Sequence, residues 1–177
     1  NLSARVFDVI PLITERVQID PEAYDEDSVQ YLEASMMYFM KHFKRVYLGD
    51  TMVTHTKVYT RLSELLPQLV DQLHVLNLFI NKIATNLKIW AKCENIVKLT
   101  IALFDDIATG YSSAKQAIKL DSTKFILKNH GIQTFPFLSV PGNQRYRTTF
   151  YHTLCKFLFL SDFTEEDFID FMRPLEA

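Results

Sequence analysis

The sequence is poor in glycine and cysteine. Only four glycines occur in 177 residues, namely Gly49, Gly110, Gly131 and Gly142. β-Sandwiches and nucleotide-binding α/β folds need more glycine than this in their turns and phosphate loops. The two cysteines, Cys93 and Cys155, are too few for a disulfide framework, so a reducing compartment is the simplest interpretation. The scarcity of glycine favours an all-α protein.

Long apolar runs and an excess of one charge are also absent. Uninterrupted apolar runs such as 157–160 fall far short of a membrane span. The chain carries 19 basic and 21 acidic residues, for a net charge of −2. No overall field attracts nucleic acid, and no polybasic run marks a membrane surface. We therefore expect no direct binding to DNA and no membrane insertion.

Catalytic and metal-binding motifs are missing too. The four glycines never approach one another to form a phosphate loop, and neither a GxSxG elbow nor an HExxH motif occurs. The five histidines lack the spacing that would place two metal ligands on one helix face. The sequence therefore predicts no catalytic residue, no cofactor-binding residue and no metal ligand, and we do not expect an enzyme.

What the sequence does contain is helical periodicity, most clearly between residues 73 and 120. One apolar stripe, spaced by three and four residues, comprises Leu73, Leu76, Ile80, Ile83, Leu87 and Trp90. Polar residues, Lys82 among them, fall away from it. A second stripe comprises Ile96, Leu99, Leu103 and Ile107. It stops at Gly110, which suits a left-handed helix cap. The short connection predicts an antiparallel hairpin, stripe against stripe.

The remaining chain shows the same periodicity in further helices. We predict them over residues 2–17 (interrupted by Pro11), 27–48, 53–66, 112–120, 121–131, 146–160 and 164–174. In the second of these, the inward residues are expected to be Leu32, Met36, Phe39, Met40, Phe43 and Tyr47. The segment 132–143 contains two prolines and a glycine, so it is the best candidate for a mobile loop.

The order of these helices predicts a repeat array. The helix-turn-helix spacing recurs at roughly 40 residues, which is typical of HEAT or armadillo proteins. We expect residues 1–177 to form one segment of an α-α superhelix, with about four helix pairs and no separate domains. Repeat arrays expose apolar residues at their ends, and Phe168, Phe171 and Met172 are expected to do so. A closed multi-helix bundle is the alternative.

One helix face offers candidate partner contacts. Lys98, Asp105 and Thr109 share the face opposite the second stripe of the hairpin. A solvated face is the simpler interpretation, and the adjacent acids Asp105 and Asp106 need no catalytic role. The alternative is a protein-contact face, because the second helix of each pair often lines the inner surface of a solenoid. Trp90 lies on the apolar stripe, so we expect it in the core.

Several segments resemble a known family. They are IATNLKIW at 83–90, GYSS at 110–113, FILKNH at 125–130, KVY at 57–59, RLSE at 61–64 and RTTFY at 147–151. Taken in their order along the chain, and over nearly its whole length, they resemble the exportin 7 family of the importin-β superfamily.

The resemblance implies a HEAT-repeat superhelix that carries protein cargo between nucleus and cytoplasm under control of the GTPase Ran. The implied partners are Ran, protein cargo and nuclear pore proteins. The family's main Ran grip lies in its N-terminal repeats. We expect those repeats to lie outside this chain, which begins at Asn1 and is expected to be a segment of a longer protein. No Ran-contact residue is therefore carried over. A helical-repeat scaffold or adaptor without a Ran link is the alternative function.

Overall fold

The described part of the chain is all α-helical, as predicted. The computed structural model describes residues 26–47 and 72–176, so the helices expected over 2–17 and 53–66 lie outside the described residues. Within these ranges there are helices and 3-10 turns but no strand. The elements are α2 (Glu26–Tyr47), α4 (Gln72–Ile89), α5 (Glu94–Thr109), α6 (Tyr111–Ala117), α7 (Asp121–Lys128), η3 (Pro136–Ser139), η4 (Pro141–Asn143), α8 (Gln144–Leu160) and α9 (Glu165–Glu176).

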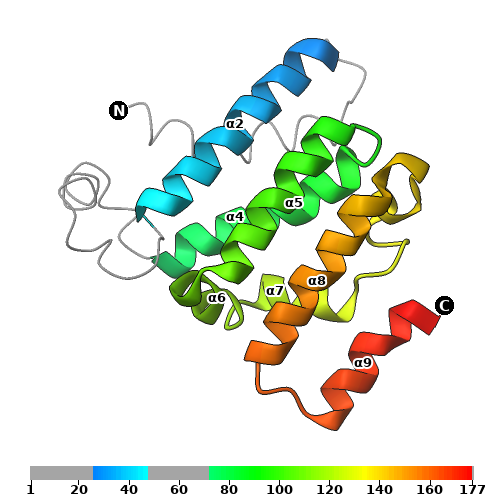
Figure 1. Ribbon diagram of the computed structural model, residues 1–177. Helices are drawn as coiled ribbons and strands as arrows, with labels where there is room; N and C mark the ends of the chain where they lie inside the picture. Colours follow the sequence, from blue (N-terminus) through cyan, green and yellow to red (C-terminus); the bar gives the residue numbers. More distant parts are fainter. Residues whose placement is uncertain (1–25, 48–71, 177) are drawn as a thin grey trace.

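The helices form two layers. In one layer α2, α5 and α8 lie side by side and run in the same direction, with α5 in the middle (Figure 1). The second layer contains α4, α7 and α9, in which α7 contacts both neighbours. Its helices begin at Gln72, Asp121 and Glu165, so the layer recurs after 49 and 44 residues. These intervals exceed the predicted spacing because α6 and the η3–η4 segment are inserted. The arrangement is that of a helical-repeat solenoid.

The hairpin of α4 and α5 has the predicted antiparallel pairing. The stripe residues Leu76, Ile80, Ile83 and Leu87 are fully buried, and Trp90 is 8% exposed. Only Leu73, in the first turn of α4, is substantially exposed. Because α5 packs against α2, α4 and α8, it buries residues well beyond its predicted stripe, including Val97, Thr100, Ile101, Phe104 and Ala108.

Lys82 of α4 and Leu32 of α2 do not lie where the helical periodicity predicted them. Lys82, expected off the apolar stripe, is buried, and its Nζ lies 2.7 Å from Glu33 Oε1. Leu32, expected to point inward, is 43% exposed. The reason is that α2 is rotated by about one residue, so that Glu33 and Met37 replace Leu32 in the buried face.

Gly110 does not adopt the expected left-handed conformation. Its backbone is extended, with φ −67° and ψ 125°. A Cβ atom at this position would lie 2.5 Å from Ser113 Oγ and 2.8 Å from Lys44 Nζ. A larger residue here would have to displace the Ser113 hydroxyl and the Lys44 ammonium group, so glycine suits the close approach of α2 and α6 to the end of α5 and does not serve a positive φ.

The segment 132–143 is irregular, as predicted, but it is anchored in the core. Phe135 and Phe137 are fully buried and meet Phe150 of α8 edge-on, at ring-centroid distances of 5.6 and 5.2 Å. Asn143 Nδ2 donates hydrogen bonds to the carbonyls of Ala91 and Phe137, at 2.9 and 3.1 Å. The expectation of a mobile loop is therefore wrong, because its aromatic side chains complete the hydrophobic core.

The last helix has the predicted start but a different end. Thr164 Oγ1 accepts from the Asp167 N–H at 3.1 Å, and the Thr164 N–H donates to Asp167 Oδ2 at 3.0 Å. This reciprocal pair is a capping box. The helix continues through Pro174 to Glu176. A proline in the final turns forfeits a single backbone hydrogen bond, so it does not have to end the helix there.

Candidate protein-interaction surface

The three predicted partner-facing residues lie along the line where α5 meets α8. We call this line the α5–α8 seam. It consists of Glu94, Lys98, Asp105 and Thr109 from α5 and Arg145, Tyr146, Thr153 and Lys156 from α8. Spacings of four, seven and four residues place the α5 members on one helix face. Because α5 and α8 run in the same direction, the start of one meets the start of the other.

Glu94 holds the N-terminal end of the seam together. Its Oε1 accepts hydrogen bonds from the Tyr146 hydroxyl and from the Arg145 guanidinium, each at 3.0 Å. These bonds, with Tyr146 the stronger influence, lower the pKa of the Glu94 carboxyl. Burial, and then the hydrogen bond to Glu94, raises the pKa of Tyr146. Glu94 therefore stays ionised and fixes the first turn of α8 against that of α5.

Lys156 brings two of the predicted residues together at the other end. Its Nζ donates to Asp105 Oδ1 at 2.8 Å and to Thr109 Oγ1 at 3.0 Å. Thr153 Oγ1 donates to Asp105 Oδ1 at 3.3 Å. The Lys156 and Asp105 side chains are 43% and 36% exposed. An exposed pair of this kind contributes only about 0–1 kcal/mol, so both side chains can exchange it for contacts with another protein.

Along α5, Lys98 lies between these two clusters and takes part in the hydrogen bonds of neither. It is exposed and forms no ion pair with another described residue, although its charge acts on Glu94. Along the seam, cationic and anionic groups alternate. Arg145, Tyr146 and Lys156 were not among the partner-facing residues predicted from the sequence. Only their spacing along one face of α8, together with the absence of any acid in that helix, could have indicated them.

The described residues show no metal site and no candidate membrane span. They contain no group of three or more His, Cys, Asp or Glu side chains that could hold a metal ion. Nor does any helix among them combine the length and apolar character that crossing a membrane requires. The seam can therefore offer charge and hydrogen bonds to a partner.

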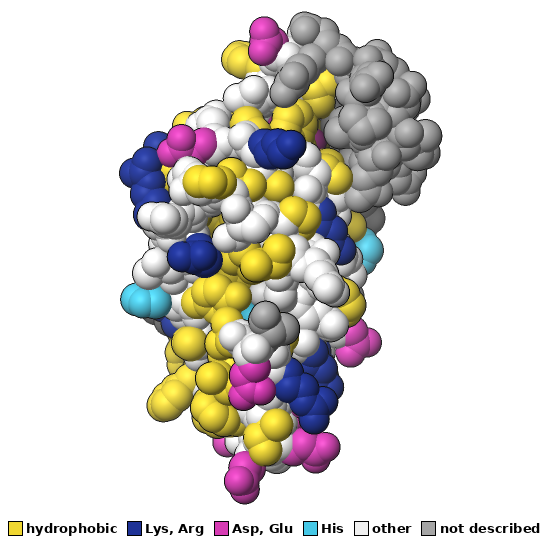
Figure 2. Space-filling view, turned by 90° about the vertical axis from the view of Figure 1, so that its right-hand side faces the viewer, with side chains coloured by type: hydrophobic (Ala, Val, Ile, Leu, Met, Phe, Trp, Pro, Cys, Tyr) yellow, Lys and Arg dark blue, Asp and Glu magenta, His cyan; other side chains and the backbone are white. Residues whose placement is uncertain are grey.

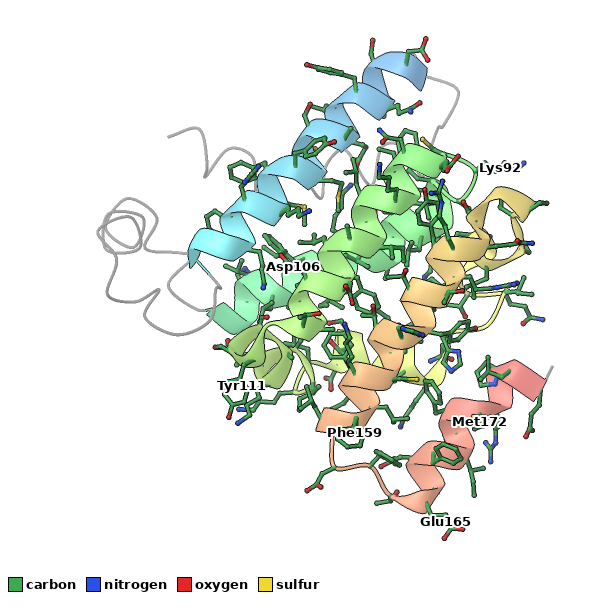
Figure 3. All side chains as sticks on the ribbon, viewed as in Figure 1. Lys92, Asp106, Tyr111, Phe159, Glu165 and Met172 are labelled. Carbon is green, nitrogen blue, oxygen red and sulfur yellow. The ribbon has the colours of Figure 1, made fainter. Side chains whose placement is uncertain are left out.

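Apolar side chains gather at the α8–α9 end of the molecule. Figure 2 shows them as a broken yellow band that widens at the lower end of this face. The exposed residues there are Phe159, Leu160, Phe163, Phe168, Ile169 and Leu175. Phe168 is exposed as expected, but Phe171 is buried. Figure 3 shows Phe159 on the last turn of α8 and Glu165 at the tip of α9.

His130 explains why Phe171 is buried. Its Nε2 lies 2.7 Å from the Phe171 carbonyl oxygen, so Nε2 carries the proton and donates. Its ring contacts those of Phe171 and Tyr151 at centroid distances of 4.6 and 5.4 Å. Burial lowers the pKa of His130. The neutral imidazole thus docks α9 against α7 and α8, which is a structural role.

Comparison with known proteins identifies the family. A family model described as "Exportin-7-like, TPR domain" matches residues 1–146. The chain belongs to the exportin-7-like family. The resemblance found in the sequence is therefore confirmed, and α8 and α9 extend the same array beyond the matched region.

Among named relatives of this exportin-7-like chain, Ran-binding protein 17 of Mus musculus is 39% identical over 181 residues, covering 99% of this chain and 16% of the relative. Exportin-7-B of Xenopus laevis is 41% identical over 152 residues, 82% of this chain and 14% of the relative. Exportin-7 of Dictyostelium discoideum is 36% identical over 187 residues, which cover 99% of this chain and 18% of the relative. The chain thus spans less than a fifth of the length of these relatives. No solved structure matches it significantly.

Proposed function

We propose that the chain is a segment of a Ran-dependent receptor that exports protein cargo from the nucleus. The single observation that carries this proposal is the exportin-7-like family match over residues 1–146. The relatives named Ran-binding protein 17 and Exportin-7 support the link to Ran and to export. The two-layer helical array agrees with it, because such arrays bind proteins over extended surfaces.

In this proposal the chain works as a scaffold and not as an enzyme. Residues 1–177 act as one solenoid segment of about four helix pairs, without separate domains. Ran and cargo bind two curvatures of the full-length array with different affinities, and this difference couples the two ligands. The receptor moves between nucleus and cytoplasm through contacts with nuclear pore proteins.

Within this scaffold the α5–α8 seam is the proposed partner-facing surface. Lys98, Asp105 and Thr109 present charge and hydrogen-bonding groups on the layer formed by α2, α5 and α8. Lys98 is the member best placed to bind, because it is exposed and has no ion-pair partner among the described residues. An acidic side chain of cargo can pair with it without breaking an internal contact.

The Ran link is tested with the full-length protein that contains this chain. It is immobilised and exposed to Ran loaded with either GTP or GDP. Retention of Ran-GTP but not Ran-GDP is expected. Equal retention of both, or of neither, favours the alternative function, a helical-repeat scaffold or adaptor that assembles protein complexes without Ran.

The seam is tested with Lys98→Glu in the same full-length protein. The matched control is Lys41→Glu, which changes the charge equally on α2, away from the seam. Quantitative mass spectrometry of proteins retained in the presence of Ran-GTP should show losses for Lys98→Glu alone. Identical profiles for both variants would show that Lys98 faces no partner.

A further inference from the structure

The helices α4, α6 and α7 and their connections are rich in lysine. Six lysines are exposed in residues 72–92 and 110–131; one of them, Lys92, lies in the α4–α5 connection, and the other five are Lys88, Lys115, Lys119, Lys124 and Lys128. We call these five, with the aromatic residues Tyr111 and Phe125, the lysine surface. Residues 72–92 and 110–131 contain a single acid, Asp121, whereas α9 of the second layer carries Glu165, Glu166 and Asp167 in its first turn. In a chain whose net charge is −2, this is a marked local segregation of positive charge.

The fold brings these residues together from three elements. α4 contacts both α6 and α7, and the Ser122 hydroxyl of α7 donates to Asn77 Oδ1 of α4 at 2.9 Å. Lys88, near the end of α4, lies over the Phe125 ring of α7, with Nζ 5.9 Å from the centroid. Lys124 and Lys128 are one helical turn apart on α7. The lysine surface is therefore built from three elements, of which α4 contacts the other two.

The lysine surface holds little internal counter-charge, because Asp121 is the one acid in the segments that carry it. None of its five lysines forms an ion pair with a carboxylate of the described residues. Lys115 is held by Tyr111, since its Nζ donates to the hydroxyl and lies 4.1 Å from the ring centroid. Tyr111, on α6 (Figure 3), is 64% exposed and Phe125 is 48% exposed. Clustered ammonium groups repel one another, and an anionic partner removes that repulsion.

We propose that the lysine surface binds a short acidic segment of a partner protein, with aspartate or glutamate side chains on the lysines and an apolar side chain against Phe125. The charge complementarity determines the chemistry of the partner. The exposed aromatic rings favour a polypeptide, because its apolar side chains can pack on them between acidic residues. The inference does not depend on the Ran link.

Two features favour a short peptide over nucleic acid. First, the surface contains lysines and no arginine, so it lacks the planar forks that bind phosphates and base edges bidentately. Second, the acidic first turn of α9 borders it. The pKa of Asp167 is lowered mainly by hydrogen bonds with Thr164 and also by the charge of Lys128. A long polyanion that continued past Lys128 would be repelled by Glu165, Glu166 and Asp167.

The test uses the full-length protein and a fluorescein-labelled peptide. The peptide contains ten alternating Glu and Asp residues, with one additional Phe at its centre. Fluorescence anisotropy measures its dissociation constant. Lys119→Glu with Lys124→Glu should weaken binding by about tenfold or more, because four units of charge change beside the anion. The control, Lys41→Glu with Arg147→Glu, makes the same charge change elsewhere and should stay within about twofold of wild type.

Circular dichroism establishes whether each variant is folded. If the variant with Lys119→Glu and Lys124→Glu is not folded, the variant with Lys119→Gln and Lys124→Gln takes its place. Binding should also weaken as salt rises, since the contacts are exposed ion pairs. Any of three results overturns the proposal: no binding by wild type, an equal loss in the control variant, or tighter binding of a ten-nucleotide oligouridylate or of phosphatidylserine vesicles than of the peptide.

Discussion

Lys82 of α4 and Glu33 of α2 form an ion pair inside the core. The Nζ and Oε1 atoms are 2.7 Å apart, and the two side chains are 1% and 0% exposed. Burial lowers the pKa of Lys82, while the charge and hydrogen bond of Glu33 oppose this effect. One turn further along α4, Asn86 Nδ2 donates to Thr100 Oγ1 of α5 at 3.2 Å. Polar contacts therefore join α2, α4 and α5 at a defined register, since any slip leaves a buried charge unpaired.

Breaking this pair from one side should be strongly destabilising. Lys82→Met leaves the Glu33 carboxylate buried without its counter-charge, and we expect it to lower the free energy of unfolding by about 3–5 kcal/mol. Urea denaturation followed by circular dichroism measures the change. The double variant Glu33→Leu with Lys82→Met should regain most of the loss, because no charge then remains buried. A double variant as unstable as the single one contradicts this explanation.

Trp90 should contribute strongly to the folding stability of the α4–α5 hairpin. It is 8% exposed at the end of the buried stripe. Trp90→Ala should lower the free energy of unfolding by about 3–5 kcal/mol, through lost burial and the cavity left behind. The comparison variant is Phe159→Ala, since that ring is 82% exposed. If both variants unfold at the wild-type denaturant concentration, the indole ring is not part of the core.

Gly110 and Gly142 should respond differently to the same substitution. Gly110→Ala places a methyl group within 3 Å of Ser113 Oγ and Lys44 Nζ, both of which hold hydrogen bonds. We expect a cost of about 1–3 kcal/mol from the displaced groups. Gly142→Ala meets no atom within 4 Å and should be neutral or slightly stabilising. Thermal unfolding distinguishes the two, and equal melting temperatures would argue against a tight α2–α5–α6 junction.

His130 should make folding stability depend on pH. Burial lowers its pKa in the folded protein, so the unfolded chain binds the proton more readily. Its contribution is complete above the unfolded value of about 6.5 and is lost as pH falls through the lower folded pKa. His130→Gln should flatten the decline of stability below about pH 6.5, whereas His152→Gln, on the exposed face of α8, should not. An unchanged profile for His130→Gln rules out this linkage.

The regular helices could be predicted because their signal is local and cumulative. In α4 and α5 the apolar spacing repeats over several turns, so a single misplaced residue does not obscure it. The buried pair could not be predicted in this way. Lys82 and Glu33 each look like ordinary surface residues, and only their contact across 49 positions makes their burial tolerable.

The same limit applies to the seam and to the loop after α7. Helical spacing correctly placed Asp105 and Thr109 on one face, but their contact with Lys156 depends on α5 and α8 lying side by side. Proline and glycine correctly indicated irregular backbone over 132–143. They say nothing about the burial of Phe135 and Phe137, which tertiary packing determines.

The central claim is that this chain is part of a Ran-dependent receptor. Isothermal titration calorimetry of the full-length protein with Ran-GTP and with Ran-GDP tests it most directly, with residues 1–177 titrated alone for comparison. The account predicts heat of binding and a measurable affinity for Ran-GTP, none for Ran-GDP, and weak or no binding by residues 1–177 alone. Equal affinities of the full-length protein for the two nucleotide states would contradict it.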